Sequence, residues 1–283
     1  MNNETKIIIL AAGKGERMNS DEPKVLTKVR GKSMIKYLLE SVHESGVDDK
    51  PTIIVGYKKE IVMNELGKEN KQYHYINQET QRGTGHAVSL AKDYLKDTTE
   101  HIMVLYGDHP FVSAKTIKKI NEKHLKSKKE ITMATVKLPD FKDWRINFVN
   151  FSRIIRDRNE KIIKDIQFKD ASDEEKKVTE VNPCYFCFNT IWLWKNLESL
   201  KNDNAQKEYY LTDLIKIATT EGIEIESMEI EPYEALGANT RAELEILENS
   251  AKKILEKSRE SKTSLRMGAF ILALERIKVK MRG

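Results

Sequence analysis

Residues 6–10 form a short apolar run that passes directly into a loop of small residues and glycines. Four successive large apolar side chains after Lys6 are typical of a buried strand. The small residues Ala11, Ala12, Gly13 and Gly15 let the following backbone pack closely against a ligand and turn its N–H groups toward phosphate oxygens. This succession predicts a core strand whose end opens onto a binding edge of a sheet.

Positive charge gathers in the same loop. Lys14, Arg17 and Lys24 can oppose the charge of a triphosphate, and Pro23 stiffens the backbone that aims Lys24. The loop is not a P-loop, because it has no Gly-Lys-Ser/Thr ending, and it lacks the third glycine of the dinucleotide fingerprint. We therefore expect a nucleoside triphosphate site in which Arg17 and Lys24 stabilise charge, while Lys14 faces either the ligand or water.

Apolar runs alternate with amphipathic stretches through the first half of the chain. Strands are expected at 6–10, 52–56, 73–76, 102–105 and 131–137, and helices at 33–45, 58–66, 84–95 and 114–127. This alternation predicts an α/β fold, a Rossmann-like and mostly parallel sheet with helices on both faces. Ligand-binding groups then belong at the carboxyl ends of strands, where the Gly13 loop and Asp108 both follow apolar runs.

The second half is less regular. Short strands are expected at 161–168 and 181–189, a helix near 209–220 and a strand near 222–229. Beyond Arg241 two helical stripes appear, formed by Leu244, Leu247, Ala251 and Ile254 and by Phe270, Leu274, Ile277 and Met281. We expect a domain at 1–241 and a helical basic tail at 242–283. The tail would pack on its own domain or form a homo-oligomer, with an anionic lipid or another partner as the alternative.

Charge and hydropathy exclude several classes of partner. The formal net charge is +5, and residues 261–283, with six basic side chains against Glu275, account for all of it. Residues 1–260 are balanced, so nucleic acid is not expected as a partner. No apolar run approaches the roughly 20 residues of a membrane span. The first residues lack the basic and apolar regions of a signal peptide, so a cytoplasmic protein is expected.

The two cysteines, Cys184 and Cys187, have a spacing that is compatible with a redox or zinc role. A strand over 181–189 would place their side chains on opposite faces. Two thiolates also leave a zinc site two ligands short. We therefore expect structural thiols without a disulfide.

An ordered series of motifs follows the glycine loop. The blocks are Gln78 with Arg-Gly-Thr-Gly-His-Ala at 82–87, Leu-Tyr-Gly-Asp at 105–108, Phe-Lys-Asp-Ala at 168–171, Glu-Tyr-Tyr-Leu-Thr-Asp at 208–213 and Gly-Ala-Asn-Thr-Arg at 237–241. In this order the chain resembles the sugar-phosphate nucleotidyltransferases, most closely the uridyltransferase domain of bacterial enzymes that make UDP-N-acetylglucosamine. The resemblance implies the nucleotide-diphospho-sugar transferase type of fold. Bifunctional members also carry hexapeptide repeats for acetyl transfer; this sequence shows none, so no acetyltransferase activity is expected.

The resemblance also implies the roles of individual residues. Asp108 and Asn239 would hold Mg²⁺, and the alternatives are an ordinary turn aspartate and a helix N-cap. The residues implied for nucleotide binding are Leu10, Ala11, Ala12, Gly13, Gln78, Gly83, Thr84, Tyr106 and Gly107. For the stretch 82–86 the alternative is a loop that caps the following helix, and neither His86 nor His109 is assigned to catalysis.

The sugar-binding side departs from the family pattern. Asn182 keeps the expected asparagine, but Ser152 stands in place of a glycine and Gln167 in place of a glutamate. Pro183-Cys184 replaces the small Thr-Gly pair that normally follows the asparagine. Glutamine keeps the reach of glutamate but removes its charge and adds a donor.

These implications combine into one expected activity. The chain would transfer UMP from UTP to a sugar-1-phosphate, most simply N-acetylglucosamine-1-phosphate, with Mg²⁺ offsetting the repulsion between the two anions. The alternatives are another acceptor, such as glucose-1-phosphate, or a non-catalytic subunit that binds nucleotide sugars.

Overall fold

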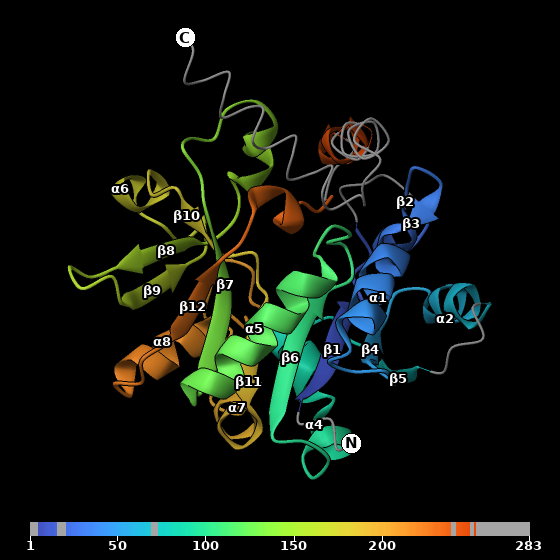
Figure 1. Cartoon of the computed structure of the whole chain (residues 1–283), viewed down its shortest axis with the longest axis horizontal. Helices are drawn as coiled ribbons and strands as arrows, with labels where there is room; N and C mark the ends of the chain where they lie inside the picture. The colour runs from blue at the N-terminus through green and yellow to red at the C-terminus, as the bar shows by residue number, and fades with distance from the viewer. Residues whose placement is uncertain (1–4, 16–20, 69–72, 239–241, 250–251, 253–283) are drawn as a thin grey trace.

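The computed structural model describes residues 5–15, 21–68, 73–238, 242–249 and 252. A ten-stranded mixed sheet with the order β5-β4-β1-β6-β11-β7-β10-β8-β9, and with β12 beside β7, runs through it (Figure 1). Arg17, Asn239 and most of the basic tail lie outside the described residues.

The part of the chain that contains the predicted nucleotide site forms a parallel sheet. Its strands are β1 (Thr5–Ala11), β4 (Thr52–Val55), β5 (His74–Asn77) and β6 (His101–Tyr106), all parallel to one another. Side chains along β1 alternate between two cores: Ile7 and Ile9 belong to one, and Ile8 belongs to the other. A strand buried on both faces explains the unbroken apolar run at the start of the sequence.

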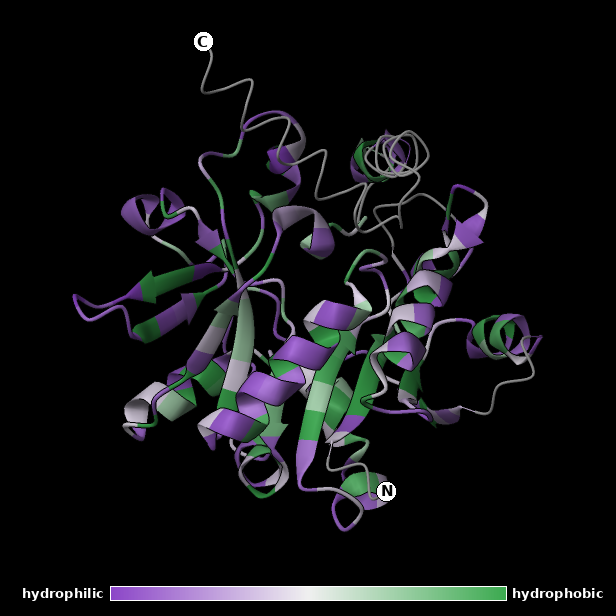
Figure 2. Ribbon diagram, in the orientation of Figure 1, coloured by the Kyte–Doolittle hydropathy of each residue, from purple (hydrophilic) through white to green (hydrophobic). Residues whose placement is uncertain are grey.

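Helices cover both faces of this sheet. The core of Ile7 and Ile9 includes α1 (Met34–Ser45), α2 (Lys59–Gly67) and α5 (Ala114–Ser127), and α1 and α5 cross in front of the sheet in Figure 1. The core of Ile8 includes α3 (Thr84–Ser89), α4 (Lys92–Leu95), α7 (Thr190–Leu197) and α8 (Asp213–Thr220). Figure 2 shows hydrophobic central strands and a hydrophilic outer side on α5. The predicted fold class is confirmed.

The second half extends the sheet with antiparallel strands. β11 (Phe186–Asn189) runs antiparallel to both β6 and β7 (Ile131–Lys137), while β12 (Glu226–Glu229) runs parallel to β7. β10 (Glu180–Val181), β8 (Arg153–Arg156) and β9 (Ile162–Ile166) continue from β7, and the β8–β9 hairpin projects at the left of Figure 1.

Shorter elements complete the described chain. They are the hairpin of β2 (Lys28–Val29) and β3 (Lys32–Ser33), the helix α6 (Asp173–Lys176) and three 3₁₀ turns at Lys24–Leu26, Asp143–Phe148 and Pro232–Ala235.

Two expected elements are interrupted. The helix expected at 84–95 breaks between α3 and α4, where the Ser89 hydroxyl donates to the His86 carbonyl and competes with the helical pattern. The strand expected at 181–189 breaks between β10 and β11. There the Asn182 Oδ1 accepts from the Cys184 N–H at 2.6 Å, and Cys184 adopts a φ of 64°.

Both cysteine thiols are free, and Cys187 and Cys184 pack on opposite cores, as expected for a pair that faces opposite sides of the sheet. The described part of the tail, 242–249, is helical. Leu247 in this helix is buried in the core of Ile7, and Glu248 accepts from the Arg30 N–H at 3.0 Å. No helix in the described ranges is both long and apolar enough to cross a membrane.

Candidate active site

The carboxyl ends of β1, β4 and β6 meet at one edge of the sheet. The Gly107 N–H donates to the Leu10 carbonyl at 2.9 Å, and the Tyr57 N–H donates to the Ala12 carbonyl at 3.1 Å. A Cβ on Gly107 would lie 3.1 Å from the Leu10 carbonyl oxygen, which is closer than most Cβ contacts, so the backbone packs tightly there. The strand end and the loop that were predicted to bind nucleotide therefore lie together at this edge. We call this surface the floor of the site.

Lys24 points across this floor to Asp108. Its ammonium group forms an ion pair with Asp108 Oδ2, and both side chains are largely buried. The buried Val25 and Leu26 anchor the 3₁₀ turn that begins at Lys24. Gly15 has a φ of 70°, and a Cβ on it would lie 2.8 Å from the Lys24 Cβ. The glycine loop and Lys24 thus pack directly on each other, as two parts of one site.

The Asp108 carboxyl keeps its charge despite burial. Burial raises its pKa, but Lys24 and His109 outweigh this effect and hold the pKa below its usual value. His109 Nε2 lies 3.9 Å from Asp108 Oδ1, and His109 Nδ1 hydrogen bonds to the Tyr185 hydroxyl at 3.0 Å. Because Tyr185 donates its own hydrogen to the Glu234 carbonyl, His109 must donate from Nδ1. Sequence reasoning gave this buried histidine no role, and the structure places it beside Asp108.

The predicted base-binding residues converge on Gln78. Its side chain is 4% exposed, and its Nε2 lies 3.2 Å from the Gly83 carbonyl and 3.0 Å from His86 Nδ1. Gly83 has a φ of 104°, and a Cβ on it would lie 2.6 Å from the Tyr209 carbonyl oxygen. Only glycine fits this position without moving the backbone.

A second segment, residues 208–211, holds this loop from the far side. The Tyr209 N–H donates to the Arg82 carbonyl and the Gly85 N–H to the Tyr209 carbonyl, both at 2.8 Å. The Leu211 N–H donates to Thr84 Oγ1 at 2.9 Å. The sequence singled out 208–213 as a motif but not this role, because the pairing joins positions more than 120 residues apart.

The residues predicted to bind sugar lie together beside β8 and β9. The Asn182 N–H donates to the Ser152 carbonyl at 3.2 Å, and Asn182 Nδ2 donates to Asp165 Oδ2 at 2.6 Å. Gln167 Nε2 donates to Thr212 Oγ1 at 2.9 Å. Asn182 is only 1% exposed, and both ends of its amide are engaged by protein groups.

Comparisons with known proteins show the family to which the chain belongs. A family model described as the MobA-like NTP transferase domain matches residues 7–211. The chain belongs to the MobA-like NTP transferase family. Curated relatives named bifunctional protein GlmU share 36% identity over 263 residues in Caldicellulosiruptor saccharolyticus and 38% over 254 residues in Clostridioides difficile. These matches cover 93% and 89% of the chain but 55% and 53% of the relatives, so the chain spans about half their length.

A solved structure shares the fold of this NTP transferase domain. It is described as a putative glucose-1-phosphate thymidylyltransferase from Bacillus anthracis, with a TM-score of 0.68 and 19% identity. The match covers 87% of this chain and 94% of that one.

The chemistry of Asp108 suits a magnesium ligand in this NTP transferase domain. Mg²⁺ in such enzymes usually takes one or two carboxylates and completes its shell with phosphate and water oxygens. Within the described residues, no group of three or more His, Cys, Asp or Glu side chains gathers as a metal site, so a metal at Asp108 would rely on such oxygens. A Cβ on Gly237 would lie 3.0 Å from the Asp108 carbonyl oxygen. The backbone therefore reaches Asp108 two residues before Asn239, which itself lies outside the described residues.

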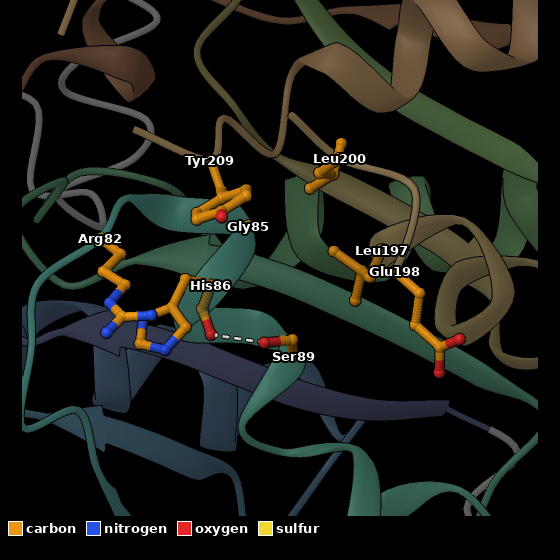
Figure 3. A pocket seen from close by; sticks show the side chains of 8 residues that line it. All are labelled: Arg82, Gly85, His86, Ser89, Leu197, Glu198, Leu200 and Tyr209. Atoms are coloured by element: carbon orange, nitrogen blue, oxygen red, sulfur yellow. Dashed lines mark hydrogen bonds between the residues drawn. The ribbon is translucent and has the colours of Figure 1, made fainter. Parts of the chain in front are cut away.

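A cavity of about 280 Å³ lies beside the loop that carries Gln78 and Gly83, which we call the base loop (Figure 3). It is lined by Arg82, Gly85, His86, Ser89, Leu197, Glu198, Leu200 and Tyr209. None of the predicted site residues is among these lining residues. This cavity is therefore separate from the residues that sequence reasoning assigned to the site.

Proposed function

We propose that this NTP transferase domain transfers UMP from UTP to a sugar-1-phosphate, with N-acetylglucosamine-1-phosphate as the first acceptor to test, and releases pyrophosphate. The observation that carries the proposal is the Lys24–Asp108 ion pair on the floor of the glycine loop, next to the loop of Gln78 and Gly83. The similarity to proteins named GlmU supports uridine as the nucleoside.

The hydrogen bonds of Gln78 suit a uracil ring. Its two amide hydrogens point to the Gly83 carbonyl and to His86 Nδ1, which leaves Oε1 as the acceptor. Uracil presents one N–H between two carbonyls, so Gln78 Oε1 can accept from that N–H. Burial lowers the pKa of His86, which favours the neutral ring that can accept at Nδ1. Backbone groups near Ala11, Ala12, Gly83 and Thr84 would complete the nucleotide site, beside Leu10, Gly13, Tyr106 and Gly107.

Charge stabilisation would come from Lys24 and Arg17. Both reactants are anions, so the main tasks of the protein are to hold them in line and to offset their repulsion. Under this proposal, Lys24 would exchange Asp108 for a phosphate oxygen when the triphosphate binds. Asp108 and Asn239 would hold Mg²⁺, which would neutralise phosphate charge when bound. No covalent nucleophile is required.

The acceptor would bind on the β8–β9 side, near Ser152, Gln167 and Asn182. The Gln167 side chain keeps an oxygen that can accept a hydrogen bond, since its Nε2 donates to Thr212. The loss of the glutamate charge at this position favours a second candidate, the same transfer to another sugar-1-phosphate such as glucose-1-phosphate.

The test is pyrophosphate release with MgCl₂, UTP and each sugar phosphate in parallel. Release with N-acetylglucosamine-1-phosphate alone supports the proposal as stated. Release with a different acceptor keeps the chemistry and changes the substrate. Tight UTP binding without release from any sugar phosphate would instead support a non-catalytic binding subunit.

A further inference from the structure

Asp165 is a half-buried carboxyl for which the proposed reaction gives no role. It lies on β9, opposite Ile154 of β8, and its Oδ2 accepts from Asn182 Nδ2 at 2.6 Å. Its Oδ1 and the nearby Ser152 Oγ are both buried, and neither has a hydrogen-bond partner elsewhere among the described residues. Burial and the Asp213 carboxylate raise its pKa to about 7, and the neighbouring Ser152 and Asn182 groups only partly oppose this. Burying a carboxyl with one oxygen unpaired destabilises the fold, and the one hydrogen bond to Asn182 offsets only part of this effect.

That hydrogen bond fixes a strained turn. With Nδ2 held by Asp165, the other end of the Asn182 amide accepts from the Cys184 N–H at 2.6 Å. Cys184 has a φ of 64°, a backbone conformation that residues other than glycine rarely adopt. Contacts with the surrounding structure must stabilise it. The Asn182 amide therefore acts as a brace between β9 and the turn at 182–184.

The turn lies where the two halves of the site meet. Cys184 contacts the side chain of Tyr106, two residues before Asp108, and both pack on the core of Ile8. At its other end the turn begins with Asn182, whose backbone N–H donates a hydrogen bond to the Ser152 carbonyl. A shift of this turn would therefore move Asn182 and Ser152, on the proposed acceptor side, relative to Asp108.

We propose that Asp165 is a positioning residue that holds the 182–184 turn through Asn182 and thereby sets acceptor binding, an inference that rests on the proposed transfer to a sugar-1-phosphate. Asp165 acts through Asn182 and does not touch the reacting atoms. Its removal is expected to affect the acceptor and to spare the nucleotide.

Three variants test this inference. Asp165→Val removes the acceptor atom, while Asp165→Asn keeps an oxygen that can accept from Asn182. Lys164→Val is the matched control, because Lys164 is the exposed neighbour on the same strand.

The first readout is amide hydrogen exchange at Cys184, which needs no substrate. We expect exchange about tenfold faster in Asp165→Val, from loss of one buried hydrogen bond, and near wild-type rates in the other two variants. The second readout is steady-state kinetics: the acceptor KM should rise about tenfold in Asp165→Val with the UTP KM unchanged.

Each outcome bears on a separate claim. Unchanged Cys184 exchange in Asp165→Val, or equal loss in Asp165→Asn, would overturn the positioning role, whatever the activity. Faster exchange with an unchanged acceptor KM would overturn the link to the acceptor. If the wild-type protein turns over no sugar phosphate, the proposed function fails, and the exchange measurement still decides whether Asp165 holds the turn.

Discussion

At the scale of single residues, the site consists of charges that satisfy one another. Lys24 and Asp108 are 84 positions apart in sequence and meet in a place where neither has much access to water. A buried charge left without its partner destabilises a protein far more than the loss of an exposed ion pair does. The two residues are therefore coupled: whatever binds one must leave a partner for the other.

Asp108→Ala is expected to reduce turnover roughly 100-fold or more, because it removes the proposed magnesium ligand from a site that works by electrostatic stabilisation. Steady-state pyrophosphate release measures the effect. Asp49→Ala, an exposed aspartate beyond the end of α1, serves as the control and should behave like the wild type. Near-normal rates in Asp108→Ala would remove Asp108 from the metal site.

Gln167→Glu is expected to raise kcat/KM for N-acetylglucosamine-1-phosphate by roughly tenfold if that sugar is the natural acceptor, since a charged hydrogen bond is stronger than a neutral one. Glutamate can still pair with Thr212, by accepting from its hydroxyl. The measurement compares the ratio of kcat/KM between this acceptor and glucose-1-phosphate. A fall in activity with the amino sugar would point to a different acceptor.

At the scale of elements, the interface between α5 and the sheet contains an unusual polar contact. His124 on α5 is 1% exposed, and its two ring nitrogens hydrogen bond to His101 on β6 and Thr132 on β7. Burial, with a smaller effect from His101, lowers the pKa of His124 to about 4. The helix is thus joined to two strands by a ring that must stay neutral.

Acid should therefore loosen this interface. An unfolded histidine titrates near pH 6.5, so between that pH and about 4 the unfolded chain takes up a proton that the folded chain does not. We expect His124 to contribute a loss of about 3 kcal/mol in the free energy of unfolding over this range. Urea titrations at pH 7 and pH 4.5 measure it, and His124→Gln should show a smaller pH dependence than the wild type. An equal dependence in both proteins would contradict the assignment.

The elements that sequence reasoning placed correctly are those with local causes. β1, β7 and α5 follow from apolar runs and helical periodicity, and the glycine loop follows from its residues. β10 has two residues and forms only because β7 and β8 pair with it, so no local sequence pattern predicts it. Asp165 escaped notice for the same reason, since its partner Asn182 lies 17 residues away. The break at Cys184 needed the Asn182 side chain, which sequence reasoning assigned to a sugar.

At the scale of the whole molecule, the parallel half of the sheet, which carries the glycine loop, and the antiparallel half, which carries β8 and β9, are parts of one sheet. β11 lies between β6 of the parallel half and β7 of the antiparallel half, and both hydrophobic cores include residues from each half. The segment 208–213 adds a second connection, because it holds the base loop through Tyr209 and meets Gln167 through Thr212. Neither half has a core of its own.

We therefore expect a single cooperative unfolding transition in scanning calorimetry, with the calorimetric enthalpy equal to the van 't Hoff enthalpy. Near-ultraviolet and far-ultraviolet circular dichroism should report the same midpoint. Two resolved transitions would show that the halves unfold separately and would contradict this reading of the sheet.

The antiparallel strand β11 has a consequence for how such a protein can diversify. Residues 138–185 lie between β7 and β11 in the sequence and form β8, β9 and β10 at one end of the sheet, while β7 and β11 pair directly with each other. Insertions or exchanges within residues 138–185 leave the pairing of β7 with β11 intact. Each doubling in the length of a flexible loop costs only about 0.6 kcal/mol. Under the proposed function, the acceptor side can thus accumulate changes such as Gln167 while the glycine loop, Lys24 and Asp108 stay as they are. Under the proposed function, mutation can alter what the protein accepts while what it donates stays constant.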